Sequence, residues 1–181
     1  YLTMSPAPCS PSQRPVYSID DNKEPLVCVA TDKEATSTQI QMFYKHPAKD
    51  VKTWGDYREQ YLVNSLFEIM FDERLAELGE KKSCPYMQAG AGYGGFLARP
   101  VSAYQMYVVA KEGKVMEALE AMMLENRRLQ QHGFLQTELD RAKESLLERY
   151  ERAAKEESKT ESSRIAAELV DYFLENTPMP G

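Results

Sequence analysis

Three glycines have a spacing that can bind phosphate groups. Gly90, Gly92 and Gly95 form G-x-G-x-x-G within CPYMQAGAGYGGFLARP, residues 84–100. This pattern cradles a dinucleotide pyrophosphate only where a strand turns directly into a helix. Here Pro100 and an alternating apolar pattern follow, which predict a second strand. We therefore expect a glycine-rich strand that packs closely against a neighbour and can pair with an extended peptide at a sheet border.

Few side chains are suited to hydrolytic or metal chemistry. His46 comes at a predicted strand end and His132 at a predicted helix end, which favours structural roles for both. Neither histidine has another ligand at zinc spacing, so we expect no autonomous metal site. Cys9, Cys28 and Cys84 form no C-x-x-C pair, which favours ordinary thiols.

Arg74 is predicted at the end of a long helix, just before the glycine-rich strand. Its guanidinium could reach a carbonyl or carboxylate at the strand border. The alternative is an ordinary surface ion pair with Glu73 or Glu77.

The composition indicates one globular domain. The chain has 181 residues, of which 43% are hydrophobic and 28% are charged, enough to bury a core. A net charge of -6 disfavours nucleic acid or an anionic membrane surface as the main partner. No apolar run approaches the roughly 20 residues that a membrane span needs.

The elements predicted to position these residues are two pairs of strands that flank a long helix, followed by helices only. Residues 1–25 contain five prolines and predict an extended arm, and residues 26–181 are expected to form the domain. Strands are predicted at residues 26–30, 37–44, 86–93 and 102–110. A long helix is predicted from Trp54 to Gly79, with Thr53 and Asp56 as its start signal. We expect an α+β fold with a mainly antiparallel sheet of four to six strands and helices packed on one face.

Three further helices are predicted after the last strand. One begins at Val115 and ends at a left-handed Gly133, and the next begins at Thr137 with Asp140 three residues later. Residues 161–176 predict a last helix, stopped by Pro178. Its side chains expected to face inward are Ile165, Leu169, Tyr172 and Phe173. A further set at helical spacing is also expected in the core, namely Tyr57, Tyr61, Met116, Met122 and Met123.

Several stretches resemble a known family. HGFLQTELDRAKESLL, residues 132–147, and MFDERLAEL, residues 70–78, followed by a small-residue strand, are similar to the non-catalytic, C-terminal-type domain of pitrilysin/insulinase-like zinc metallopeptidases, or inverzincins. The resemblance extends from about Arg14 to the end of the chain. It implies a metallohydrolase fold of the LuxS/MPP-like type.

The resemblance also implies a division of labour. In such enzymes four similar domains form two halves that close around an unfolded peptide, and the first domain carries the zinc motif H-x-x-E-H. This sequence contains no H-x-x-E-H, so it resembles a second domain that forms scaffold and chamber wall. The implied partners are the other domains of the same polypeptide and a peptide substrate. Zinc is expected in the catalytic domain of the parent and not in this segment, and a bacterial periplasm or cell envelope is one location that the resemblance suggests.

The resemblance assigns candidate substrate-binding residues. Related domains hold substrate near the zinc with an Arg at this helix end and a Tyr soon after, which match Arg74 and Tyr86 at a longer interval. In some members a glycine-rich border strand anchors the substrate by strand addition, which agrees with our interpretation of residues 89–96. The residues expected to bind peptide there are Ala91, Gly92, Gly94, Gly95 and Phe96.

Two other functions remain open at this stage. The chain could be a stand-alone α+β interaction module whose helices dock another protein. It could also be the nucleotide enzyme that the glycine spacing suggests, in which case a dinucleotide would raise its melting temperature.

Overall fold

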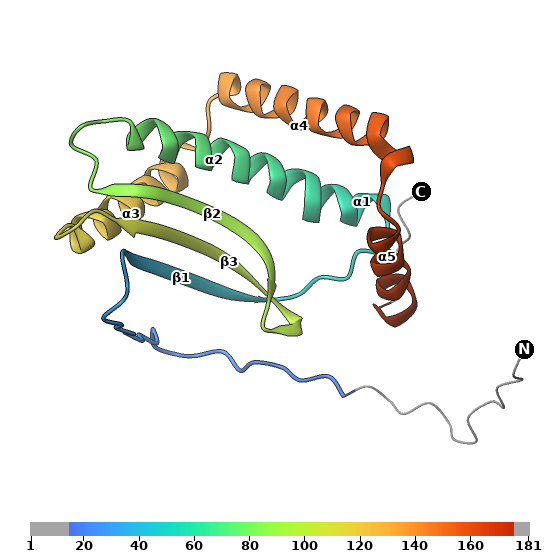
Figure 1. Ribbon diagram of the computed structural model, residues 1–181, viewed down its shortest axis with the longest axis horizontal. Coiled ribbons are helices and arrows are strands. Elements are labelled where there is room, and N and C mark those ends of the chain that lie inside the picture. Colours follow the sequence, from blue (N-terminus) through green and yellow to red (C-terminus); the bar gives the residue numbers. More distant parts are fainter. Residues whose placement is uncertain (1–14, 176–181) are drawn as a thin grey trace, which may run out of the picture.

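The fold is a three-stranded antiparallel sheet with helices packed on one face (Figure 1). The computed structural model describes residues 15–175. The strands are β1 (Thr38–Pro47), β2 (Tyr86–Phe96) and β3 (Ala98–Ala110), in the order β1-β3-β2. The α+β class is confirmed. The expected four to six strands are not found, because residues 15–175 form three, and the LuxS/MPP-like type stays a prediction.

The prediction of a strand at residues 26–30 is wrong. This segment has no regular structure, and Leu26, Val27 and Val29 are each more than four-fifths exposed. A short apolar run forms a strand only where a partner strand and a core are available to it. Residues 15–25 are also irregular, whereas the rest of the expected arm, with Cys9, lies outside the described residues, as does Pro178.

One long helix crosses the sheet. It comprises α1 (Trp54–Tyr57), a π-helical segment η1 (Arg58–Val63) and α2 (Asn64–Gly79). The predicted start is confirmed: Thr53 Oγ1 accepts from the Asp56 amide at 3.2 Å, and the Asp56 carboxylate accepts from the Thr53 amide at 2.9 Å. The predicted end at Gly79 is confirmed as well.

The core lies between this helix and the sheet. Phe71 and Leu75 of α2 pack against Met106 and Val108 of β3, and all four side chains are fully buried. Met122 of the next helix joins the same cluster. The alternation predicted for β3 therefore places its even-numbered residues on the covered face.

The remaining helices are α3 (Val115–His132), α4 (Gln136–Glu156) and α5 (Ser162–Glu175), with a short 3-10 turn η2 (Glu157–Lys159) between the last two. Gly133 ends α3 with a φ of 68°, which favours glycine, and its amide donates to the Leu129 carbonyl at 2.8 Å. α4 begins one residue before Thr137, and Glu138, not Asp140, accepts from the backbone at its start.

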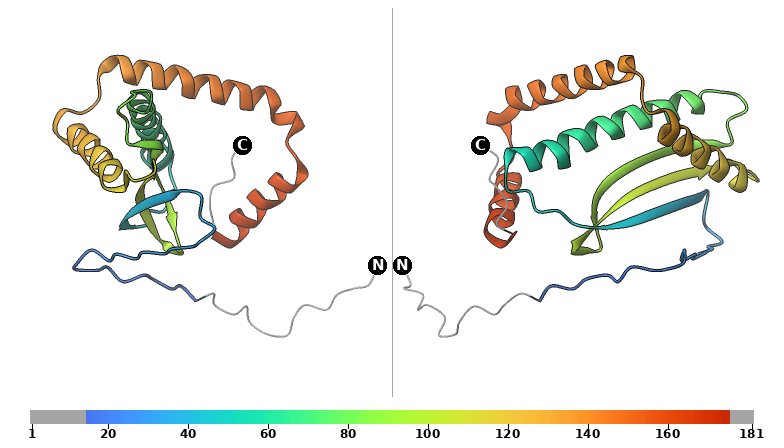
Figure 2. Two further views of the ribbon diagram at one scale, coloured as in Figure 1. Left: turned by 60° about the vertical axis from the view of Figure 1, so that its left-hand side comes forward. Right: turned by 180° about the vertical axis from the view of Figure 1, so that it is seen from behind.

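The inward face predicted for α5 is wrong. Ile165, Leu169 and Tyr172 are each about half exposed, and Phe173 is 81% exposed. The views in Figures 1 and 2 show why: α5 follows the far end of α4 and stands apart from the sheet and α2. An amphipathic pattern defines an apolar face, but burial needs a surface to pack against.

The expected core set of aromatic and methionine side chains is divided. Met122 is fully buried, whereas Tyr61 and Met116 are more than half exposed and Met123 is also exposed. Tyr57 is partly buried and forms a hydroxyl–hydroxyl hydrogen bond of 3.2 Å to Tyr150 of α4. Of the five side chains expected in the core, only Met122 is therefore fully buried.

Candidate functional site

The glycine-rich strand β2 is an edge strand, and α2 lies along it. Two of its amides point away from β3 and are already bound by α2. The Ala91 amide donates to Asp72 Oδ1 at 2.9 Å, and the Tyr93 amide donates to Glu68 Oε1 at 2.7 Å. The carboxylates of α2 therefore accept the hydrogen bonds that these two edge amides would otherwise donate to a neighbouring strand or to water.

The spacing of these bonds follows from helix and strand geometry. Glu68 and Asp72 are four residues apart on a helix, a rise of about 6 Å. Ala91 and Tyr93 are two residues apart on a strand, a rise of about 6.8 Å. Because the two repeats nearly coincide, one pair of carboxylates can bind two successive outward amides. We call residues 91–93 the capped edge.

The edge beyond Tyr93 differs. Gly94 and Gly95 have no other heavy atom within 4 Å of the position where a Cβ would be, apart from their chain neighbours. Phe96 packs against Phe43 of β1 with ring centroids 4.9 Å apart, and the hairpin then turns at Leu97, whose φ is 54°. We call residues 94–96 the open edge.

Gly90 has a packing reason to be glycine. A Cβ there would lie 2.7 Å from Cε1 of Tyr107, whose ring covers this position from β3. The Tyr107 hydroxyl accepts from the side-chain amide of Gln88 at 3.0 Å, which holds the ring in place. This agrees with the expectation that a neighbour packs closely over the strand.

The strand that follows β2 confirms the predicted hairpin. Gly90, Gly92 and Gly95 all lie within β2, which turns directly into β3 without a helix. A dinucleotide fingerprint requires a helix N-terminus at that point. A shallow groove of about 230 Å³ lies beside Gly92 on the face away from the helices, next to Phe43, Gln105 and Tyr107.

Arg74 points away from β2. Its guanidinium binds both carboxylate oxygens of Glu138 and donates to the Gly133 carbonyl at 2.9 Å. Glu125 Oε1 lies 3.6 Å away, and the Phe134 ring is 4.8 Å from the guanidinium carbon. The side chain is only 17% exposed, so these contacts use its donors to join α2, α3 and α4.

The ion pair expected between Arg74 and Glu73 or Glu77 is not formed. Those two glutamates lie 3.8 and 3.7 Å from Arg141 of α4 instead. The Arg74 guanidinium holds the pKa of Glu138 below its usual range, mainly through the hydrogen bond. These contacts favour a structural role for Arg74, and a role in substrate binding stays a prediction.

Tyr86 is an interior residue. Its side chain is buried, and its hydroxyl donates to the Leu75 carbonyl at 2.7 Å. Burial raises the pKa of this phenol. The structure thus brings Ala91, Gly92, Gly94, Gly95 and Phe96 together on β2 and directs Arg74 and Tyr86 elsewhere.

Two carboxylates central to this arrangement were not identified from the sequence. The sequence predicted no role for Glu68 and Asp72, although their i, i+4 spacing on the helix that precedes an edge strand is a usable signal. Partial desolvation raises the pKa of Asp72, and the hydrogen bond from the Ala91 amide opposes that shift.

Metal-binding groups do not gather in the part of the chain that the structure describes. Residues 15–175 contain no cluster of three or more histidine, cysteine, aspartate or glutamate side chains that could hold an ion. The His46 ring lies near that of Tyr93, with centroids 6.1 Å apart and the planes tilted, and His132 lies at the end of α3. Cys28 is an exposed thiol and Cys84 a buried one. Within the same residues, no helix has both the length and the apolar character required to cross a bilayer.

The known proteins to which the chain is similar are zinc proteases. No family model matches the chain. It is 22% identical over 171 residues to the zinc protease PQQL-like of Arabidopsis thaliana, covering 94% of this chain and 15% of that protein. It is 25% identical over 150 residues to the probable zinc protease PqqL of Escherichia coli K12, covering 83% of this chain and 16% of that protein. The chain thus spans about a sixth of the length of these relatives.

Solved structures share the fold. The periplasmic protease PqqL from Escherichia coli superposes with a TM-score of 0.74 at 24% identity, over 83% of this chain and 16% of that one. The separately solved first half of the same protease gives 0.73 at 26% identity and is covered to 32%. A predicted insulinase family protease from Yersinia pestis gives 0.64 at 10% identity, over 80% of this chain and 31% of that one.

These similarities confirm the resemblance to pitrilysin/insulinase-like zinc proteases. The relatives include PqqL proteins, and the chain aligns with a segment of each.

Proposed function

We propose that this chain is a non-catalytic domain of a zinc-dependent metalloendopeptidase that forms part of the substrate chamber. The observation that carries the proposal is the match to one third of the first half of PqqL, at 26% identity and a TM-score of 0.73. Zinc and the water-activating glutamate then belong to another domain of the parent. A periplasmic location is part of the same proposal, since the Escherichia coli relative is a periplasmic protease.

The open edge, Gly94–Phe96, is the part of β2 proposed to bind an extended peptide. Outward amides alternate along an edge strand, so after Ala91 and Tyr93 the next is that of Gly95. The small residues at 94 and 95 leave room for a second backbone, and peptide pairing at a strand edge gives main-chain affinity. At the capped edge a peptide would have to displace Asp72 and Glu68 first.

Hydrogen exchange tests this binding mode. A short peptide of alternating Val and Lys should slow exchange of the Gly95 amide, while the Ala91 and Tyr93 amides, already bound, should change little. The control is the same peptide with methylated backbone nitrogens, which cannot pair with a strand. Equal protection by both peptides, or protection confined to the capped edge, would contradict pairing at residues 94–96.

One observation favours the alternative of a stand-alone interaction module. The exposed apolar side chains of α5 form a surface that another protein or another domain could cover. The mass of the natural protein distinguishes the two functions. A product near 20.7 kDa would favour the module, and one several times larger would favour the protease segment.

A further inference from the structure

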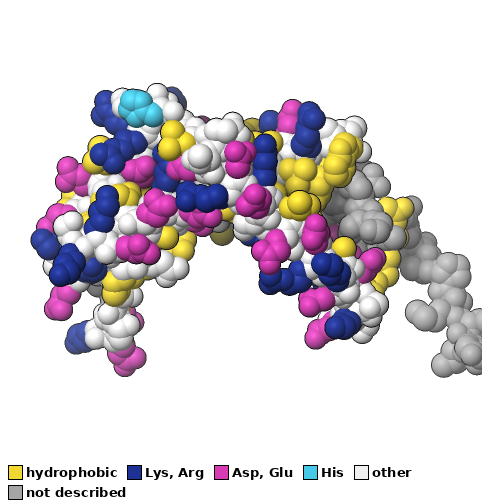
Figure 3. Space-filling model, turned by 90° about the horizontal axis from the view of Figure 1, so that it is seen from above, with side chains coloured by type: hydrophobic (Ala, Val, Ile, Leu, Met, Phe, Trp, Pro, Cys, Tyr) yellow, Lys and Arg dark blue, Asp and Glu magenta, His cyan; other side chains and the backbone are white. Residues whose placement is uncertain are grey.

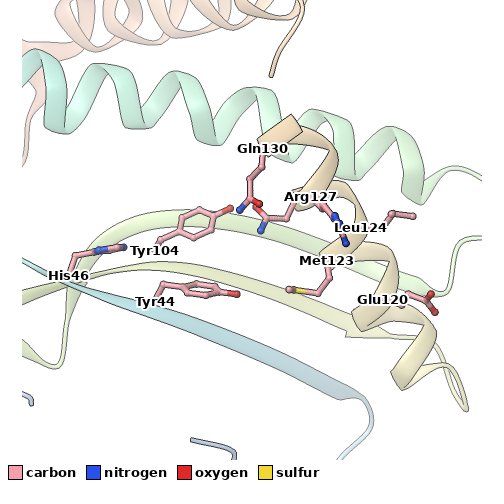
Figure 4. A pocket seen from close by; sticks show the side chains of 9 residues that line it. Tyr44, His46, Tyr104, Glu120, Met123, Leu124, Arg127 and Gln130 are labelled. Carbon is pink, nitrogen blue, oxygen red and sulfur yellow. The ribbon is translucent and has the colours of Figure 1, made fainter. Parts of the chain in front are cut away.

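A cleft on the helix side of the sheet is separate from the β2 edge. It has a volume of about 670 Å³ and lies between α3 and the strands β1 and β3 (Figure 4). Tyr44 and Tyr104 form its strand wall, and Met123, Arg127 and Gln130 line it from α3. It therefore combines an apolar surface with several hydrogen-bond donors.

Tyr104 brings a buried donor to this cleft. Its hydroxyl oxygen is buried and has no hydrogen-bond partner among residues 15–175. An edge contact with Phe67, with centroids 5.8 Å apart, holds the ring, which extends toward Gln130 in Figure 4. Burial raises the pKa of Tyr104 to about 12, so the phenol keeps its proton at neutral pH. A buried hydroxyl of this kind favours a ligand that supplies an acceptor.

Arg127 brings a positive charge. The neighbouring Arg128 pairs with Glu125 at 3.4 Å, whereas the described residues provide no ion pair or hydrogen bond for Arg127. A guanidinium with unused donors matches a carboxylate, which it can bind with two parallel hydrogen bonds.

Two acidic side chains face the same region. Glu120 lines the cleft but lies seven residues, or about 10 Å, along α3 from Arg127. Asp72 contributes to the raised pKa of Tyr104, although its carboxylate is bound to the Ala91 amide. Within residues 15–175, neither carboxylate forms an ion pair with Arg127.

An apolar surface adjoins these donors. Tyr44 is 45% exposed, Met123 38% and Leu124 51%, and all three line the cleft. A ligand with an apolar group next to a carboxylate would use both kinds of surface at once.

From these contacts we infer that the cleft binds the C-terminal residue of a peptide. The terminal carboxylate accepts hydrogen bonds from the Tyr104 hydroxyl and the Arg127 guanidinium. The last side chain, apolar or aromatic, packs against Tyr44 and Met123. This site does not depend on strand pairing at the open edge.

Fluorescence anisotropy with the 181-residue chain tests the inference. The probe is a labelled peptide that ends in a phenylalanine with a free carboxylate, and its matched partner is the C-terminal amide. We expect the amide to bind at least about tenfold more weakly, because a hydrogen bond to a charged group is worth that much. Tyr104→Phe and Arg127→Gln should each weaken the free acid by about tenfold and leave binding of the amide unchanged.

The controls separate this site from other effects. Arg149→Gln removes the same charge from an exposed position on α4 and should leave the affinity unchanged. Tyr104→Phe removes one hydroxyl without a protein partner, so its melting temperature should match that of the parent chain. Equal affinity for acid and amide, no binding of either, or an unchanged affinity in Tyr104→Phe would overturn the inference.

Discussion

The two ends of the helical layer differ in how far the side chains of their helices find partners within the chain. At one end Arg74 joins α2, α3 and α4 through Glu138, Glu125 and the Gly133 carbonyl. At the other end, Trp54 of α1 and Phe173 of α5 are more than 70% exposed. Figure 3 shows this difference on the surface: charged side chains of both signs line the middle of the molecule, and hydrophobic ones gather at its right-hand end.

One end of the molecule is stabilised by contacts within the segment, whereas the other exposes a surface that a partner could cover. At the Arg74 end, the buried guanidinium is paired with the buried carboxylates of Glu138 and Glu125, so this cluster needs no partner outside the chain. The α5 end presents an apolar surface of the kind that marks an interaction site.

Arg74→Met should have the largest effect. It leaves Glu138 and Glu125 buried without their shared cation, and breaking a buried pair in this way costs about 3–5 kcal/mol. Urea unfolding would measure the loss. The control is Arg141→Met, which removes exposed pairs with Glu73 and Glu77 and should cost less than about 1 kcal/mol. Equal costs would contradict a structural role for Arg74.

The same pair should make stability depend on pH. Because Arg74 lowers the pKa of Glu138 in the folded state, the stabilisation is present above the unfolded pKa of about 4.3. It is lost as the pH falls through the folded value. Asp72, whose pKa is raised, acts in the opposite direction, so the comparison must be made against Glu138→Gln.

The measurement is the unfolding free energy of both proteins between neutral and acidic pH. The difference between the parent chain and Glu138→Gln should narrow as the pH falls. A difference that stays constant would show that the Glu138 charge does not stabilise the fold.

Gly90→Ala should cost about 1 kcal/mol, since a Cβ 2.7 Å from Cε1 of Tyr107 forces the ring to move and disturbs its bond to Gln88. Gly94→Ala is the matched control on the same strand. No other heavy atom beyond its chain neighbours lies within 4 Å of its new methyl group, so a few tenths of a kcal/mol are expected. Thermal unfolding of the two variants would compare them, and a larger loss in Gly94→Ala would contradict the packing described for β2.

Phe173→Ser should have the smallest effect. The side chain is 81% exposed, and its replacement should change the unfolding free energy of the 181-residue chain by less than about 0.5 kcal/mol. Chemical denaturation would measure it. A loss above about 2 kcal/mol, as expected for a core residue, would mean that α5 packs against the body in solution.

Local signals in the sequence were reliable where one short segment determines the outcome. The Thr53 and Asp56 start signal, the helix end at Gly133 and the alternation of residues 102–110 all correspond to observed elements. Each depends on backbone bonds or side-chain periodicity within a few residues.

Sequence patterns did not predict the features that depend on contacts with residues far away in the chain. Residues 26–30 lack a neighbouring strand, and α5 lacks a surface to cover its apolar face. The partner of Arg74 is Glu138, 64 residues later, whereas the sequence offered Glu73 and Glu77 one and three residues away. The glycine-rich strand was predicted, but the carboxylates that cap it were not, because their role requires the register of α2 on β2.

In the function that we propose, this segment supports proteolysis and does not perform it. The most direct measurement is an assay of the purified 181-residue chain with zinc and a quenched, unstructured peptide, with and without a chelator. We expect no chelator-sensitive cleavage. Cleavage that requires zinc and is abolished by the chelator would contradict it.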